Sequence, residues 1–294
     1  MPSAAPPPLR CPLCGGQLKV SNTSEAARRA LVCEAGHSFD AARQGYFNLL
    51  VGKGTVFEAD SADMVAARFS FLDAGHYRPL ADAVSDAVVA TVRPQTPFTV
   101  LDSGTGTGHY LRVMLDDVRR VTDDCTAVAL DISKFALRRA ARLNPEAVNL
   151  ACDVWQPLPV AGAAVDIVTV IFAPRNAAEF ARVLRPDGRL VVVTPRAGHL
   201  ASLAAQTGML AIEDEKDARL AESLAGHFIP ESTLDVDIRM KLTPAEMADL
   251  AFMGPAGHHL DRAAIAAKLD RPDQASEVDA LFRITVFRPS LPSA

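Results

Sequence analysis

Short apolar runs alternate with segments of helical periodicity between residue 98 and about residue 195. The runs that we predict as strands cover residues 98–102, 126–131, 148–153, 165–172 and 189–195. Helices are expected between them, over residues 109–117, 133–143 and 176–184. Strands that alternate with helices build a mostly parallel sheet covered on both faces. The pattern therefore predicts an α/β fold.

The chain before and after this stretch shows weaker patterns. Apolar spacing predicts helices between residues 62 and 92, with a turn around Ala74–His76. Later elements are expected as helices near residues 200–206, 215–225 and 244–252 and as an edge strand over residues 282–289. We divide the chain into a disordered lead-in over residues 1–10, a small module over 11–55, and a large domain over 56–294 that begins with a helical lead-in over 56–97.

No apolar run approaches the roughly 18 residues that span a bilayer. Residues 1–10 lack the apolar core of a secretory signal, so we expect a cytoplasmic protein. The five cysteines are too few and too unevenly spaced for a disulfide scaffold, and the cytoplasm would keep them reduced. Cys125 and Cys152 stand apart from the others and are expected to be ordinary thiols.

The net charge of −5 argues against a nucleic-acid partner, because lysine and arginine on the contacting face must neutralise phosphates. The charge is, however, unevenly distributed. Residues 1–55 hold an excess of about three basic side chains, which leaves an excess of about eight acidic ones in the rest of the chain. The small module is therefore the part that favours a nucleic acid.

The small module carries two pairs of metal-ligand residues. Cys11 and Cys14 form a C-x2-C pair, and Cys33 and His37 form a second pair. Ligands of these types and spacings suit a closed tetrahedral zinc site, which would stabilise a module too small to fold alone. A thioredoxin-like redox pair is the alternative for the first two cysteines, but it gives Cys33 and His37 no role.

A glycine-rich loop, Asp102–Gly108, reads D-x-G-x-G-x-G between the first predicted strand and the next helix. Glycines let the main chain approach a ligand closely. A dinucleotide fold would place G-x-G-x-x-G here to hold a pyrophosphate. The observed spacing, with Asp102 at the strand end, better suits a cofactor that has an ammonium group and no phosphate. Such loops also serve as simple tight turns, and this alternative stays open.

Two further acids stand at the ends of the next two predicted strands. Asp131 closes the second strand and Asp153 closes the third. The carboxyl ends of parallel strands open on one edge of the sheet, which is where ligands bind. Asp131 could accept both ribose hydroxyls of a nucleoside, and Asp153 could accept from an adenine amino group. Each acid taken singly could equally be a helix cap or a loop residue.

These motifs resemble the class I, Rossmann-like methyltransferases that use S-adenosylmethionine, and the likeness covers residues 98 to about 195. The resemblance implies in-line displacement at the sulfonium methyl group. For that reaction the protein chiefly positions the nucleophile and excludes water. The motifs point to the cofactor and leave the substrate open.

Longer strings narrow the family. They are CPLC, CEAGHSFDAARQGYFNLL, DSADMVAARFSFLDAGHYRPL, LDISKFALRRAARLNP, DVWQPLPV, IFAPRNAAEFARVLRPDGRLVVVTP and GHL. Together they resemble the 23S ribosomal RNA guanine-N1 methyltransferases, from about residue 11 to residue 255. The resemblance implies a 23S rRNA hairpin as substrate, a zinc module that helps bind the RNA, and a homodimer. Some members give actinobacteria antibiotic resistance against tylosin-type macrolides.

The resemblance also implies site residues. The implied zinc ligands are Cys11, Cys14, Cys33 and His37 of the small module. Cofactor contacts fall on Tyr77, Gly104, Gly106, Thr107 and His199, and the wider class I analogy adds Asp102, Asp131 and Asp153. Without the family, Tyr77 and His199 would be interpreted as packing or surface residues. The loop departs from the expected G-C-G-x-G-Y-Y at Thr105 and at His109, which could alter the lid of the pocket.

The catalytic residue is unknown from the sequence. The string Ala173–Asn176 follows the fourth predicted strand, where many base methyltransferases carry a loop that orients the nucleophile. Guanine N1 carries a proton that must leave, so a base or an anion-stabilising group is needed. Arg175 and Asn176 are the candidates, although an ordinary loop is an equal alternative.

Three functions therefore remain open at this stage. The first is the rRNA methyltransferase, and the second is a class I methyltransferase of a small metabolite, which the acidic charge favours. The third is a cofactor-binding or RNA-binding regulator without turnover, which His109 and the missing base allow.

Overall fold

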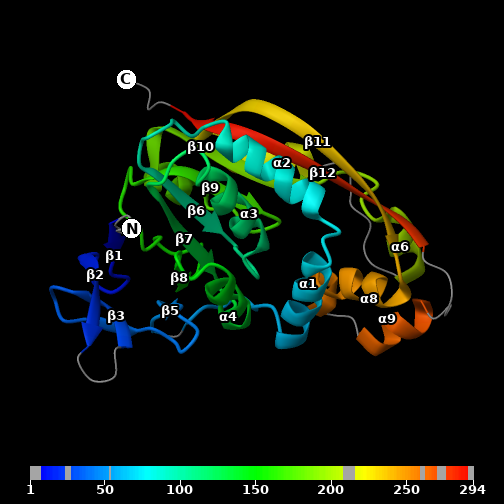
Figure 1. The fold of residues 1–294 in the computed structure, drawn as a ribbon, viewed down its shortest axis with the longest axis horizontal. Coiled ribbons are helices and arrows are strands. Elements are labelled where there is room, and N and C mark those ends of the chain that lie inside the picture. Colours follow the sequence, from blue (N-terminus) through cyan, green and yellow to red (C-terminus); the bar gives the residue numbers. More distant parts are fainter. Residues whose placement is uncertain are drawn as a thin grey trace.

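The structure, a computed structural model, describes residues 8–23, 28–52, 54–207, 216–258, 262–269 and 276–290. An eight-stranded sheet forms its centre, with a small four-stranded sheet at one end and a group of helices at the other (Figure 1). Within these ranges no helix combines the length and apolar character needed to cross a membrane.

The large sheet has the strand order β11–β12–β10–β9–β6–β7–β8–β5. Its strands are β5 (Phe47–Asn48), β6 (Phe98–Ser103), β7 (Cys125–Asp131), β8 (Val148–Ala151), β9 (Val165–Ile171), β10 (Leu184–Pro195), β11 (Phe228–Leu242) and β12 (Ser276–Pro289). Strands β5 to β10 pair in parallel, whereas β12 is antiparallel to both β10 and β11. The predicted α/β fold with a mostly parallel sheet is confirmed.

Helices cover both faces of this sheet, which explains the unbroken apolar runs of its strands. The α-helices of the described residues are α1 (Ala62–Asp73), α2 (Arg78–Val89), α3 (His109–Val118), α4 (Lys134–Leu143), α5 (Ala177–Val183), α6 (Ala201–Thr207), α7 (Lys216–Leu224), α8 (Pro244–Phe252) and α9 (Arg262–Leu269). Successive side chains alternate between the faces. In β10, Val191 and Val193 pack into the core with α2 and α3, while Leu190 and Val192 pack into the core with α5.

In the large domain after residue 56, strand β11 and helix α9 were not predicted from the sequence. Strand β11 is fifteen residues long and mostly exposed, and its inward alternation is confined to Ile238, Met240 and Leu242. Its position follows from antiparallel pairing with β12 over most of its length. Helix α9 packs against α8 at the end of the sheet. The predicted helix over 215–225 corresponds to α7, and residue 215 lies outside the described residues.

The small sheet contains β1 (Leu9–Arg10), β2 (Gln17–Thr23), β3 (Arg28–Cys33) and β4 (Ser38–Asp40), all antiparallel. The predicted disordered lead-in over residues 1–10 is wrong for Leu9 and Arg10, which lie in β1. The Arg10 backbone N–H donates to the Pro159 carbonyl at 3.0 Å, so this strand also contacts the large domain. Residues 1–7 of the lead-in lie outside the described residues.

The small module and the large domain share a core. Strand β5 precedes the boundary predicted after residue 55, yet it is the edge strand of the large sheet and pairs with β8. Leu9 and Leu31 of the small sheet are buried in the same cluster as Val160 of the large domain. The metal ligands are therefore mechanically connected to the sheet that carries the glycine loop.

Candidate cofactor site and metal centre

The glycine loop lies at the point where the chain order of the sheet reverses. Strand β6 pairs with β7 on one side and with β9 on the other, and ligands of open α/β sheets bind at such a point. Gly104 has φ +77°, and a Cβ added there would lie 2.3 Å from the Cβ of Ala173. A Cβ on Gly108 would lie 2.5 Å from the Nδ2 of Asn144. Both positions therefore require glycine because neighbouring segments approach the backbone.

Asp102 is buried at the end of β6. The Oγ1 of Thr169, on the neighbouring strand β9, donates to its Oδ1 at 2.7 Å. Desolvation raises the pKa of Asp102, and the hydrogen bond from Thr169 opposes this shift. A buried carboxyl group with only neutral hydroxyl groups as side-chain partners among the described residues is suited to a ligand that brings a positive charge.

Asp131 ends β7 and holds the glycine loop directly. Its Oδ2 accepts from the Gly106 backbone N–H at 2.8 Å, and its Oδ1 accepts from the Ser133 N–H at 2.7 Å. Desolvation raises the pKa of Asp131 to about 6, although both backbone hydrogen bonds act in the opposite direction. Each carboxylate oxygen has a second lone pair, so the group can accept further hydrogen bonds from a ligand.

Asp153 follows β8 and is buried. The Oγ1 of Thr55 donates to its Oδ2 at 3.0 Å, and the Trp155 backbone N–H donates to its Oδ1 at 3.0 Å. Trp155 is 47% exposed and its ring lies 6.3 Å from that of Phe57. The segment that leaves the small module therefore passes over the third acid, and no sequence pattern predicts this contact.

The three acids lie at one edge of the sheet because β6, β7 and β8 are adjacent and parallel. The structure brings together Asp102, Asp131 and Asp153 as the strand ends predicted.

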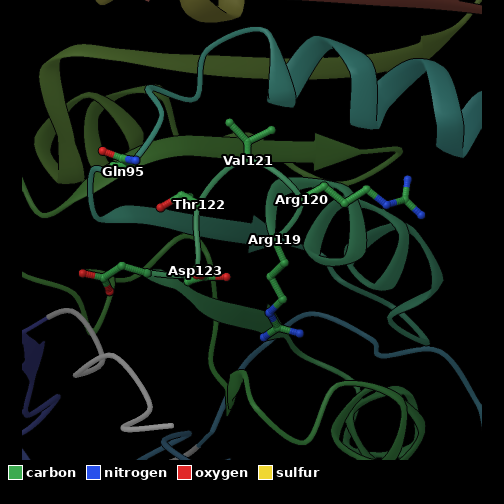
Figure 2. Close-up of a pocket in the computed structure, with 7 residues that line it drawn as sticks. Gln95, Arg119, Arg120, Val121, Thr122 and Asp123 are labelled. Carbon is green, nitrogen blue, oxygen red and sulfur yellow. The ribbon is translucent and has the colours of Figure 1, made fainter.

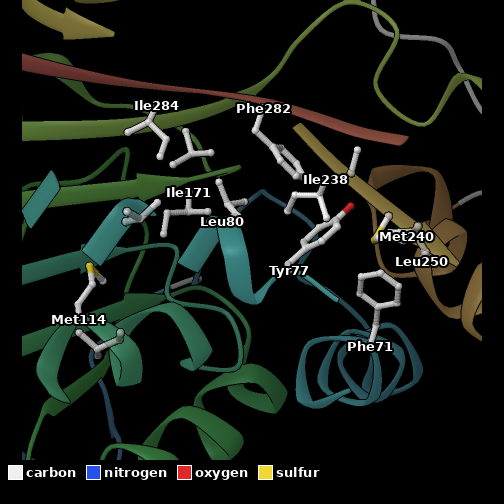
Figure 3. Packing of buried hydrophobic residues seen from close by; sticks show 14 of the residues in the cluster. Phe71, Tyr77, Leu80, Met114, Ile171, Ile238, Met240, Leu250, Phe282 and Ile284 are labelled. Carbon is white, nitrogen blue, oxygen red and sulfur yellow. The ribbon is translucent and has the colours of Figure 1, made fainter. Parts of the chain in front are cut away.

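Tyr77 and His199, which are far apart in the sequence, contact the same aromatic ring. Phe282 of β12 is fully buried, with ring centroids 5.0 Å from Tyr77 and 4.7 Å from His199. Tyr77 lies between Phe71 and Phe282, as Figure 3 shows. Burial, with a smaller contribution from Tyr110, raises the pKa of Tyr77 well above its usual value. The Leu281 backbone N–H donates to His199 Nδ1 at 3.0 Å and orients the imidazole.

Tyr110, one helical position beyond His109, was missed by the sequence analysis. Within the described residues its buried hydroxyl has no hydrogen-bond partner. Burial raises its pKa, and the nearby Asp102 acts in the same direction. A buried hydroxyl left without a partner is costly, and a bound ligand would satisfy it. Its signal in the sequence was its match to the last tyrosine of the family loop G-C-G-x-G-Y-Y.

One departure from the family loop, His109, is accommodated by packing. Thr107 is buried, and its Oγ1 lies 2.9 Å from His109 Nδ1. The His109 ring packs edge-on against Phe69, and burial lowers the pKa of its imidazole. His109 is therefore held in the wall of this region.

The loop after β9 brings Arg175 and Asn176 to the same edge. Phe172 has φ +56°, a left-handed conformation that costs free energy in any residue except glycine. The Nε of Arg175 is buried with no partner among the described residues, and burial lowers its pKa. Asn176 instead uses both side-chain groups. Its Oδ1 accepts from the Glu179 N–H at 3.3 Å as the N-cap of α5, and its Nδ2 donates to the Val154 carbonyl at 2.9 Å.

The four predicted metal ligands converge in the small module. Their ligand atoms all lie within 4.8 Å of one another. The Sγ atoms of Cys14 and Cys33 are 3.7 Å apart, and His37 Nδ1 lies 3.5 Å from Cys11 Sγ and 3.4 Å from Cys33 Sγ. Tetrahedral zinc with ordinary bond lengths separates two sulfurs by about 3.8 Å, and a sulfur from a nitrogen by about 3.5 Å. The residues therefore fit a structural zinc ion.

The turns around these ligands are built from backbone hydrogen bonds. The Gly15 N–H donates to the Cys11 carbonyl at 2.8 Å, and the Gly36 N–H donates to the Cys33 carbonyl at 2.9 Å. The other two cysteines lie elsewhere, and burial raises the pKa of Cys125 to about 11 and of Cys152 to about 12. Both are therefore protonated, as expected for thiols outside a metal centre.

A surface hollow at the opposite edge of the sheet, shown in Figure 2, does not belong to this site. It is lined by Gln95 and by Arg119–Asp124, which precede the amino ends of β6 and β7. The acids and the glycine loop stand at the carboxyl ends of the same strands.

Known proteins match both halves of the chain. A family model described as "RlmA, N-terminal" matches residues 9–52, and one described as "Methyltransferase domain" matches residues 100–188. The chain is 40% identical over 281 residues to the 23S rRNA (guanine(748)-N(1))-methyltransferase of Streptomyces fradiae, with 96% of each chain covered. It is 45% identical over 295 residues to a protein of Micromonospora griseorubida with the provisional name 23S rRNA (guanine-N(1)-)-methyltransferase, covering 96% of this chain and 98% of the other.

Proposed function

Because the chain belongs to the 23S rRNA (guanine-N1) methyltransferase family, we propose that it methylates N1 of a guanine in a 23S rRNA hairpin. The observation that carries this proposal is the combination of the glycine loop and three strand-end acids with a Cys3His centre in one connected fold. S-adenosylmethionine supplies an electrophilic methyl group when it is bound. The protein's own residues must bind it, orient the base and exclude water.

We assign the cofactor to the edge formed by Asp102, Asp131 and Asp153. Asp102 would be the buried partner of the positively charged amino-acid end of the cofactor. Asp131 would accept hydrogen bonds from the ribose hydroxyls, and Asp153 would accept one from the adenine amino group. Gly104, Gly106 and Thr107 let the backbone approach the cofactor. The unpartnered hydroxyl of Tyr110 supports this position, because a ligand there would complete its hydrogen bonding.

Tyr77 and His199 complete the proposed cofactor site from the opposite side. Tyr77 follows α1 and His199 follows β10, and the support for placing them together is that both rings contact Phe282. Replacement of His199 by alanine should weaken cofactor binding more than replacement of His227, which is in the turn before β11.

Arg175 is the residue that we propose to act on the guanine. Loss of the N1 proton leaves negative charge on O6, and a partly buried guanidinium whose Nε has no partner among the described residues is suited to stabilise it. Asn176 is engaged at the start of α5, so we propose that it positions Arg175. The base must leave its stack to reach this edge, at a cost of about a few kcal/mol that a hairpin loop reduces.

The decisive experiment offers tritiated S-adenosylmethionine to the zinc-loaded protein together with undermethylated 23S rRNA or a metabolite extract. Label in the RNA, with reverse transcriptase stopping at one guanine, supports the proposal. Guanine 748, which the name of the Streptomyces fradiae relative specifies, is the first position to inspect. Label only in small molecules supports a metabolite methyltransferase, and cofactor binding without transfer supports a regulator.

Three wider properties follow from the family as proposals. The zinc module would contribute to RNA binding, the chain would form a homodimer, and it would raise the tylosin tolerance of a sensitive host. Light scattering on the pure protein tests the second property, and growth on tylosin with and without the expressed chain tests the third.

A further inference from the structure

Arginines of this acidic chain fall into two groups. In the large domain, carboxylates pair with Arg68, Arg78, Arg93, Arg112, Arg119, Arg120, Arg182, Arg185, Arg189, Arg196, Arg239, Arg262 and Arg283. On helix α4, by contrast, Lys134, Arg138, Arg139 and Arg142 form no ion pair with any part of the chain that the structure describes. Helix α4 therefore gathers four unneutralised basic side chains within ten residues, whereas other arginines of the described large domain without an ion pair, such as Arg175 and Arg288, stand singly.

This charge lies on one face of α4. Phe135, Arg138, Arg139 and Arg142 have the spacing i, i+3, i+4 and i+7, so their side chains share one face. Phe135 is 43% exposed, and Arg138 and Arg142 are also exposed. The Arg138 guanidinium lies 5.2 Å from the centre of the Phe135 ring. A helix of ten residues is about 15 Å long, so the face forms a short basic ridge.

The other face of α4 packs against the zinc module. Leu137 and Ala141 are buried in a cluster with Tyr46, just before β5. An open hollow of about 300 Å³ lies between Gln44, helix α1 and the arginine face of α4. No acidic side chain lines this hollow. Arg43, next to Gln44, is exposed and has no ion pair within the described ranges. The basic surface therefore continues from the helix to the module.

The amino end of α4 points this surface toward the proposed cofactor site. Ser133 caps the helix, accepting from the Ala136 N–H at 3.4 Å, and its own N–H donates to Asp131. Phe135 is thus four residues from the acid proposed to bind the ribose. An RNA strand along this helix would pass directly from the zinc module to the carboxyl edge of the sheet.

We propose that the outward face of α4, together with Arg43, is the phosphate-binding surface for the RNA, and that Phe135 stacks on an unpaired base. This inference rests on the proposed function and extends it, because it places RNA contacts on the large domain as well as on the zinc module. Unpaired arginines bind phosphates without first breaking an ion pair. An exposed aromatic ring among them provides a stacking surface for a base.

The test compares two double variants of the zinc-loaded full chain. Arg138→Gln/Arg142→Gln removes two charges from the ridge. The control, Arg93→Gln/Arg239→Gln, removes the same charge from two exposed arginines that are already paired, with Asp187 and Asp279. Binding of an unmodified 23S rRNA fragment that contains the guanine 748 hairpin is measured over a range of salt concentrations.

The ridge variant should bind the fragment at least about ten-fold more weakly, and the slope of log Kd against log salt should fall by about one per arginine. Cofactor affinity and zinc content should not change, and the control variant should match the wild-type protein. Phe135→Ala should weaken binding about five-fold or more without altering the slope, whereas Leu234→Ala, an exposed apolar control on β11, should have no effect.

If the wild-type protein methylates the RNA but the two double variants show equal slopes of log Kd against log salt, the inference is overturned and the proposed function stands. A wild-type protein that neither binds nor methylates the fragment would overturn both. Normal binding of the free fragment by the ridge variant, with loss of methylation only on assembled ribosomal particles, would assign the surface to a protein partner and also overturn the RNA assignment.

Discussion

At the scale of single residues, the most informative side chain is Asp131. It holds the backbone N–H groups of Gly106 and Ser133, and it also faces the position proposed for the cofactor. Its burial raises its pKa to about 6, so its charge changes just below neutral pH.

Cofactor binding should therefore depend on pH. Below about pH 6 the Asp131 carboxyl group is protonated and loses acceptor strength, so affinity for S-adenosylmethionine should fall as the pH is lowered through this value. Asp131→Asn should weaken binding at pH 7.5 roughly ten-fold or more and remove this pH dependence. Calorimetry checks both effects, with Asp86→Asn, on an exposed face of α2, as the control. A wild-type affinity that is constant between pH 5 and 8 would contradict the assignment.

Gly104 gives a second residue-level prediction. Gly104→Ala should lower the free energy of unfolding by about 1–2 kcal/mol for the left-handed backbone and by about 1–3 kcal/mol more for the clash with Ala173. Gly226 has φ +80° with nothing near its Cβ position, so Gly226→Ala carries the backbone cost alone. Urea unfolding measures both. Equal losses would mean that the Ala173 loop moves aside freely.

At the scale of elements, the loop from β9 into α5 combines two roles that the sequence could not separate. Both Arg175 and Asn176 stand in a string typical of base methyltransferases, and the residue types alone do not rank them. The structure does, because Asn176 uses both polar groups in hydrogen bonds to α5 and Val154, whereas Arg175 Nε has no partner in the part of the chain that the structure describes.

Substitutions in this loop should separate catalysis from positioning. Arg175→Gln should reduce kcat by about a hundred-fold or more, with little change in cofactor affinity, since it removes charge stabilisation of the anionic base. Asn176→Asp keeps an N-cap acceptor and should retain most of the activity, whereas Asn176→Ala should also cost about 0.5–2 kcal/mol of stability. Single-turnover kinetics and thermal unfolding distinguish these outcomes. Full activity of Arg175→Gln would exclude the proposed role.

At the scale of the whole molecule, the zinc module is part of the core. Strand β5 joins the large sheet, and Leu9, Leu31 and Phe47 are buried with residues of the large domain. Loss of zinc should therefore lower the stability of the whole protein and not only of the module. The strands and helices that form the cofactor edge should nevertheless stay folded.

Cys14→Ser should lose zinc, lower the melting temperature and weaken RNA binding, yet leave S-adenosylmethionine affinity within about two-fold, since the cofactor edge contains none of the metal ligands. Asp102→Ala should do the reverse and weaken cofactor binding with the zinc retained. Cys125→Ser, outside the cluster, is the control for the cysteine substitution. Metal analysis and calorimetry on each variant report the two sites separately. Zinc loss from Asp102→Ala would contradict the division of the sites.

The chain's local patterns determined most of the fold. The five central strands and the helices between them were predictable, because strands buried on both faces must be continuously apolar and their helices must carry an apolar stripe. The four metal ligands were predictable because their pairs sit on short local turns. The strand-end acids were predictable because parallel topology alone collects them at one edge.

Only the tertiary structure decided which distant groups share an environment. The pairing of the exposed strand β11, the contact of Tyr77 and His199 with Phe282, and the passage of Thr55 over Asp153 depend on packing between segments far apart in the chain. The neutral or charged surroundings of each arginine are likewise a property of its neighbours in space. Sequence spacing shows which residues share a helix face, but the folded chain decides what that face contacts. The basic ridge on α4 is therefore not predictable from the sequence alone.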